Sequence, residues 1–121
     1  MTNAKSAKLQ IKRAYEASSK GDGTRILVDR LWPRGLSKKD LEGVLWAKEV
    51  APSAALRKWF GHKPERWGEF RERYFKELRV NPAVGPLREL AAGGRVTLLY
   101  GARDQTHNQA AALAEYLLSE M

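Results

Sequence analysis

Two short stretches of this chain gather residue types that could do chemistry. Residues 28–38 read VDRLWPRGLSK and combine an acid, two arginines, a tryptophan, a proline and a glycine, while residues 103–108 read RDQTHN. Arginine presents a planar fork of donors that suits phosphate and carboxylate oxygens. Aspartate and histidine can transfer protons, and histidine titrates near neutral pH. Together the stretches predict an anion site with acid–base groups beside it.

Two sets of candidate residues follow from these stretches. The candidates for proton transfer are Asp29, Asp104 and His107. The candidates for ligand binding are Arg30, Trp32, Arg34, Arg103, Thr106 and Asn108. Free backbone N–H groups at the start of a helix after residue 106 would add further donors for an anion.

Each of these residues also has a purely structural interpretation, which the sequence leaves open. Pro33 and Gly35 can simply shape a turn. Asp104 or Thr106 can cap the last helix. His62 stands just before a proline that begins a helix, where local hydrogen bonding explains a histidine as well as ligand binding does. The 28–38 stretch as a whole could be architectural.

The elements that must position these residues are predicted from periodicity and turn signals. Strands are expected within residues 9–15, 24–31, 44–51 and 95–102. Helices are expected to begin near Ser37, Ser53, Pro64, Pro82 and Thr106. A stripe of Trp67, Phe70, Tyr74 and Leu78 should face the core, which favours a buried face with a solvated basic side over a nucleic-acid surface for residues 57–79.

This order of elements predicts a single α/β domain over residues 8–121, after a frayed tail at 1–7. The sheet should be mostly parallel with helices packed on its faces. The first two strands would be antiparallel if they are neighbours, because their connection is too short for a helical crossover. Ligands of such sheets bind at the carboxyl ends of the strands, where residues 28–38 and 103–108 should meet.

Composition indicates the kind of partner. The chain has 121 residues, and 22 Lys and Arg against 14 Asp and Glu give a formal charge of +8. We therefore expect a small anionic ligand, such as a nucleotide or another phosphorylated metabolite, and weak non-specific attraction to nucleic acid. A nucleic-acid-binding module and a structural or partner-binding protein are the alternatives. Oligomeric state is not indicated.

Several other site types are disfavoured. There is no cysteine, which removes disulfides and thiolate chemistry, and the two histidines lack metal-ligand spacing, so no metal and no cofactor are expected. The GDG at residues 21–23 precedes its strand, so it does not fit a dinucleotide-binding loop. No apolar run is long enough to span a membrane, and a cytoplasmic location is expected.

Three motifs, in order, resemble the YeaO-like family of small bacterial proteins, a domain family of unknown function. They are VDRLWPRGLSK, KEVAPSAALRKWFGHKPERWGEFRERYFKEL and VTLLYGARDQTHNQA, and the resemblance runs from about residue 8 to the end. It implies an α/β fold with these loops grouped together, and no settled reaction. Lys63 stands where an acid is usual, and Gly101 and Arg103 stand where alanine and lysine are usual.

The resemblance also marks individual positions as the family's motif residues. In the first motif these are Asp29, Arg30, Trp32, Pro33, Arg34 and Gly35. In the second they are Glu49, Pro52, Trp59, Phe60, Gly61 and His62. In the third they are Tyr100, Asp104, His107 and Asn108.

Overall fold

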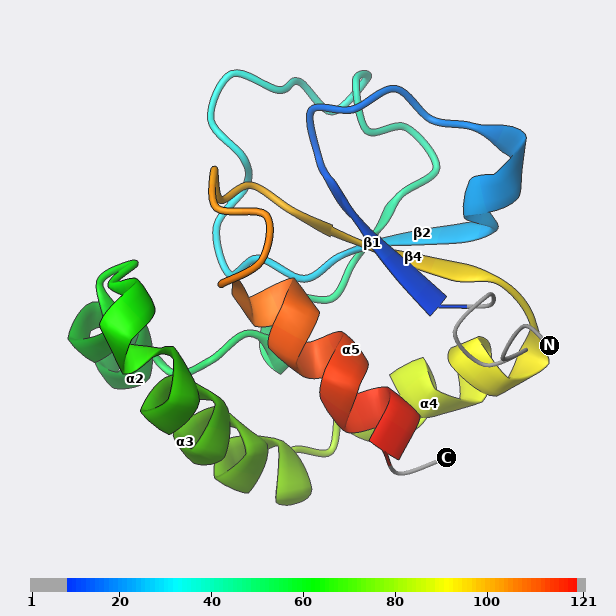
Figure 1. Ribbon diagram of the computed structural model, residues 1–121. Helices are drawn as coiled ribbons and strands as arrows, with labels where there is room; N and C mark the ends of the chain where they lie inside the picture. The colour runs from blue at the N-terminus through cyan, green and yellow to red at the C-terminus, as the bar shows by residue number, and fades with distance from the viewer. Residues whose placement is uncertain (1–8, 120–121) are drawn as a thin grey trace, which may run out of the picture.

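The computed structural model describes residues 9–119, so the tail expected at residues 1–7 lies outside the described residues. The strands are β1 (Leu9–Arg13), β2 (Thr24–Leu27), β3 (Leu45–Trp46) and β4 (Val96–Tyr100). The α-helices are α2 (Ala54–Phe60), α3 (Trp67–Arg79), α4 (Val84–Gly93) and α5 (Gln109–Ser119). Short 3-10 helices are η1 (Lys20–Asp22), η2 (Lys48–Val50) and η3 (Pro64–Arg66). Figure 1 shows their arrangement.

The four described strands form one parallel sheet in the order β1-β4-β2-β3, which confirms the α/β class and the parallel sheet. The antiparallel pairing considered for the N-terminal strand is wrong, because β4 lies between β1 and β2 and pairs in parallel with both. Residues 14–23 connect β1 to β2 without an α-helix. Extended chain spans roughly 3.3 Å per residue, so this connection is long enough to return along the strand it leaves.

The two faces of the sheet are covered differently. Val96, Leu98 and Tyr100 of β4 belong to the core shared with the four helices. Leu99 points the other way and packs with Leu27. In Figure 1 the helices lie to one side of the strands, while the connection from β2 to β3 passes over the other. The helices and this connection therefore meet near the carboxyl ends of β2 and β4.

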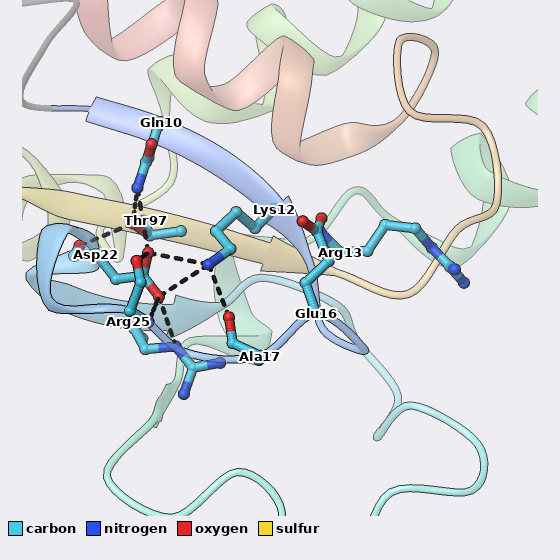
Figure 2. Close-up of polar contacts among 9 residues, drawn as sticks. Gln10, Lys12, Arg13, Glu16, Ala17, Asp22, Arg25 and Thr97 are labelled. Atoms are coloured by element: carbon cyan, nitrogen blue, oxygen red, sulfur yellow. Dashed lines mark hydrogen bonds and ion pairs between the residues drawn. The ribbon is translucent and has the colours of Figure 1, made fainter.

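A buried carboxylate fixes the connection between β1 and β2 (Figure 2). Asp22 is 1% exposed and accepts hydrogen bonds from Lys12 Nζ at 3.1 Å and from the Ser19 amide at 3.0 Å. Arg25 Nε lies 3.5 Å from Asp22 Oδ2, and the backbone carbonyl of Asp22 accepts a 2.7 Å hydrogen bond from the Thr97 hydroxyl. The GDG sequence is therefore a structural brace beside the start of β2.

Several local predictions from caps and periodicity are confirmed. The Ser53 hydroxyl accepts a 3.1 Å hydrogen bond from the Leu56 amide at the start of α2, and Gly61 ends that helix at φ 53°. On α3, Phe70, Tyr74 and Leu78 of the predicted stripe are fully buried, whereas Trp67 is only partly buried and packs against the core. The apolar face of α3 is thus core, and its basic residues form the solvated side.

Two predicted helix starts are wrong. Residues 38–43 form turns, although Ser37 and Asp40 exchange the two hydrogen bonds of a capping box. Nucleating a helix is costly, and so short a segment cannot repay that cost. The last helix does not begin at Thr106, whose hydroxyl donates a hydrogen bond to the Asp104 carboxylate. The cap is the side chain of Asn108, whose Oδ1 accepts a 2.9 Å hydrogen bond from the Ala111 amide.

Candidate functional site

A cleft of about 500 Å³ opens where the chain leaves β2 and β4, and we call it the Asp29 cleft. Its lining comes from the segments that follow β1, β2 and β4, from α2 with the residues on either side of it, and from the start of α5. The polar residues that line it are Asp29, Arg30, Arg34, Arg57, His62 and Gln109. This is the edge of the sheet at which the sequence predicts ligand binding.

Asp29 follows β2, and its carboxyl is held by the residue after β4 and by the first residue of α5. Its Oδ2 accepts a 2.9 Å hydrogen bond from the Gly101 amide, and its Oδ1 accepts one from Gln109 Nε2. A Cβ atom at position 101 would lie 2.9 Å from Oδ2, so glycine lets the carboxyl approach the backbone closely. Burial raises the pKa of Asp29 to about 6, against the lowering effect of these hydrogen bonds and of the charge on Arg57. The carboxyl therefore titrates close to neutral pH.

Three arginines line the Asp29 cleft: Arg30 and Arg34 come from the β2–β3 connection, and Arg57 comes from α2. Arg30 Nη1 lies 3.3 Å from Glu49 Oε1 in an exposed ion pair. Arg57 donates from Nε to the Pro52 carbonyl at 3.2 Å. Arg34 is exposed, and within residues 9–119 its guanidinium makes no hydrogen bond or ion pair. Arg34 is thus the arginine whose donors are all available to a ligand.

The loop that carries Arg34 is braced at several points. The Tyr15 hydroxyl donates to the Arg34 carbonyl at 2.7 Å, and Trp32 Nε1 donates to the Leu36 carbonyl at 2.7 Å. The Trp32 ring also packs edge-on against Trp46, with centroids 5.2 Å apart. These contacts hold the backbone of the loop, so Arg34 projects from a fixed position.

The loop between β4 and α5 is held by hydrogen bonds among its own residues and by packing against α3. Asp104 Oδ1 accepts 2.9 Å hydrogen bonds from the Thr106 and His107 amides, and its Oδ2 lies 2.9 Å from His107 Nδ1. These hydrogen bonds hold the pKa of Asp104 well below its usual range. The His107 ring packs edge-on against Trp67 at 5.4 Å, and Asn108 Nδ2 donates to the Asp104 carbonyl at 2.9 Å.

The structure therefore divides the residues selected from the sequence. Those that line the Asp29 cleft are Asp29, Arg30, Trp32 and Arg34. Those that stand outside its lining, among the described residues, are Arg103, Asp104, Thr106, His107 and Asn108. A catalytic role for Asp104 or His107, and a binding role for the others in this second group, remain predictions.

Sequence reasoning did not assign several residues that line the Asp29 cleft to the site, among them His62, Gln109 and Arg57. His62 carried a signal, since it belongs to the middle motif, but the sequence did not assign it to the site. Gln109 is not among the candidates from the sequence, yet its Nε2 donates a hydrogen bond to Asp29 Oδ1. Arg57 had no local signal, because its position depends on how α2 packs against the strand ends.

Two other features are absent from the part of the chain that the structure describes. Between residues 9 and 119, no group of three or more His, Asp or Glu side chains is arranged to hold a metal ion. In the same part of the chain, no helix has the length and apolar character needed to cross a membrane.

The chain is similar in sequence to a known family and to bacterial proteins. The family model described as "Inactive DUF488-N3 subclade" matches residues 8–121. The Uncharacterized protein YeaO of Escherichia coli is 45% identical over 112 residues, which is 92% of this chain and 97% of that protein. The Uncharacterized protein Rv3073c of Mycobacterium tuberculosis is 42% identical over 110 residues, or 91% and 93% of the two chains. No solved structure matches.

Proposed function

The chain belongs to the family described as the inactive DUF488-N3 subclade, together with YeaO, and from this premise we propose that it binds a small anion in the Asp29 cleft without transforming it. A nucleotide or another phosphorylated metabolite is the class of ligand we propose, in the cytoplasm. The observation that carries the proposal is the convergence of Arg30, Arg34 and Arg57 on one cleft.

The electrostatics of the Asp29 cleft support an anion. Arg34 and Arg57 come from different segments, so their positions are set by the fold. Asp29 is the only carboxylate that lines the cleft among the described residues, so the three arginines outnumber the acid there. Hydrogen bonds between guanidinium groups and an anionic ligand are charge-assisted and stronger than neutral ones.

The acid–base groups support binding without turnover. Asp104 and His107 bind each other in the loop before α5, and we propose that this pair braces the entry to that helix. Asp29 would then accept a hydrogen bond from a hydroxyl or amine group of the ligand. The word "inactive" in the family description points in the same direction.

The alternatives from the sequence make different use of the positive charge. A nucleic-acid-binding module would need cations spread along an exposed groove, whereas Arg30, Arg34 and Arg57 line one concave site. A purely structural role for residues 28–38 would pair Arg34 with a carboxylate. Arg34 has no such partner within residues 9–119. We therefore rank small-anion binding first.

A calorimetric titration with pyrophosphate and adenosine monophosphate tests this proposal. We expect Arg34→Ala to weaken binding by about tenfold or more, since a charge-assisted hydrogen bond contributes about 1.5 to 3 kcal/mol. Arg79→Ala, an exposed arginine on α3, is the matched control and should change affinity less than twofold, roughly the effect of a distant surface charge.

The affinity of Arg103→Ala for the same ligands tests whether the site includes the loop before α5. An effect equal to that of Arg34→Ala would extend the site over the loop before α5, as the sequence predicted. Equal losses for Arg34→Ala and Arg79→Ala would instead mean non-specific attraction and would contradict the proposal, as would the absence of binding.

A further inference from the structure

A second hollow of about 420 Å³ adjoins the Asp29 cleft, and we call it the Phe70 hollow. The two share a boundary, because four residues line both: Pro52, Arg57, His62 and Gln109. The shared boundary joins them into one elongated depression between α2 and the start of α5.

The two halves of this depression differ chemically. The Asp29 cleft presents the guanidinium groups of Arg30 and Arg34. The Phe70 hollow is lined by Ala54 and by the largely buried Phe60 and Phe70, whose rings stack with centroids 4.4 Å apart. The polar side chains of Lys58 and Asn108 line the same hollow, so it is less charged than the Asp29 cleft but not wholly apolar. An apolar cavity of about 150 Å³ is enough to bind benzene, so the Phe70 hollow has ample room for an aromatic ring.

His62 stands at the boundary in an uncommon backbone conformation. Its φ is +57°, in the left-handed region that favours glycine, and it directly follows Gly61 at φ +53°. A side chain in this region costs conformational energy that glycine would avoid. The exposed imidazole lines both halves, and its centroid lies 6.3 Å from that of Phe60. An imidazole here can therefore contact a ligand that spans the boundary.

We propose that the ligand is an organic phosphate, with its anionic group against Arg34 and Arg57 in the Asp29 cleft and a flat apolar ring in the Phe70 hollow. His62 is the residue that positions it at the boundary between the two. This inference rests on the proposed function and narrows it, since an inorganic anion has no ring to place in the Phe70 hollow. Burial of the ring in the Phe70 hollow supplies the extra affinity.

Affinities for phenyl phosphate and inorganic phosphate test the inference directly. For the wild-type chain we expect phenyl phosphate to bind about tenfold more tightly, because the ring removes apolar surface from water. Ala54→Phe should fill the Phe70 hollow and remove this preference while leaving affinity for inorganic phosphate unchanged. Ala55→Phe is the matched control: Ala55 is the next residue of α2, is equally exposed and lies outside the lining among the described residues.

The outcomes separate this inference from the proposed function. If wild-type chain binds both anions equally, or if Ala54→Phe and Ala55→Phe behave alike, the inference is overturned and the proposed function stands. If neither anion binds, both are overturned. His62→Gly relieves the left-handed backbone, so its melting temperature should stay level or rise while affinity for phenyl phosphate falls. A lower melting temperature with unchanged affinity would show that His62 is structural and would overturn its positioning role.

Discussion

At the scale of single residues, Asp29 links the stability of the fold to pH. Its carboxyl is withdrawn from water between β2, β4 and α5, which raises its pKa from 3.8 to about 6. The folded chain therefore binds this proton more tightly than the unfolded chain does. The sign follows from linkage: stability from this group is fully present below the unfolded pKa and is lost as pH rises through the folded value. Ionised Asp29 is a cost to the fold at neutral pH.

Asp29→Asn should reveal this cost. Asparagine keeps an oxygen for the Gly101 amide but carries no charge, so the variant should gain stability relative to wild type as pH rises. We expect the difference in unfolding free energy to shift in favour of the variant by on the order of 2 kcal/mol between about pH 4 and pH 7. Urea denaturation of both proteins at the two pH values measures it. A difference independent of pH would contradict a raised pKa.

At the scale of elements, α3 shows how a strongly basic segment is fixed by its apolar side. Phe70 is 2% exposed, stacks on Phe60 and packs 5.7 Å from both Trp67 and Tyr74 between ring centroids. Tyr74 in turn donates a 2.6 Å hydrogen bond to the Val50 carbonyl, which ties α3 to the segment after β3. The charged side of α3 instead bears an exposed ion pair between Arg73 and Glu69. Exposed ion pairs contribute little, so the apolar face carries the stability of this element.

Phe70→Ala should accordingly destabilise the fold by about 3 to 5 kcal/mol, the usual cost of removing a buried aromatic ring. Lys76→Ala, an exposed position on the same helix, should change the free energy of unfolding by less than about 0.5 kcal/mol. Chemical denaturation of the two variants beside wild type measures both effects. A loss below about 1 kcal/mol for Phe70→Ala would mean that this face of α3 is exposed in solution and would revive a stacking role for its aromatic residues.

The elements also show which parts of the fold the sequence could predict. Caps such as Ser53 and Gly61, and the stripe on α3, depend on near neighbours in the chain, so periodicity found them. The insertion of β4 between β1 and β2 depends on contacts far apart in sequence. The residues of the Asp29 cleft show the same difference between local and distant contacts. Asp29 and Arg34 follow a recognisable strand and could be predicted, whereas Arg57 reaches the cleft only through the packing of α2.

At the scale of the whole molecule, the formal charge of +8 is only partly neutralised within the fold. Ion pairs engage some cations, including Lys12 with Asp22 and Arg71 with Glu115. The remaining cations create a positive potential that attracts any polyanion, even without a dedicated site. Attraction of this kind acts over the surface, and salt screens it within about 8 to 10 Å at physiological ionic strength. It is therefore distinguishable from binding in the Asp29 cleft.

Binding to nucleic acid should be weak and without sequence preference, because the general charge of the chain can contact phosphates but has no arrangement for reading bases. Fluorescence anisotropy with two single-stranded oligonucleotides of unrelated sequence should give equal affinities, falling at least about tenfold as salt rises from about 50 to 200 mM. Arg34→Ala and Arg79→Ala should weaken this attachment equally, since each removes one surface charge, whereas only Arg34→Ala should weaken binding of a small phosphate. Sub-micromolar affinity for one sequence at physiological salt would reverse the ranking, and the cations outside the Asp29 cleft would then form the functional surface.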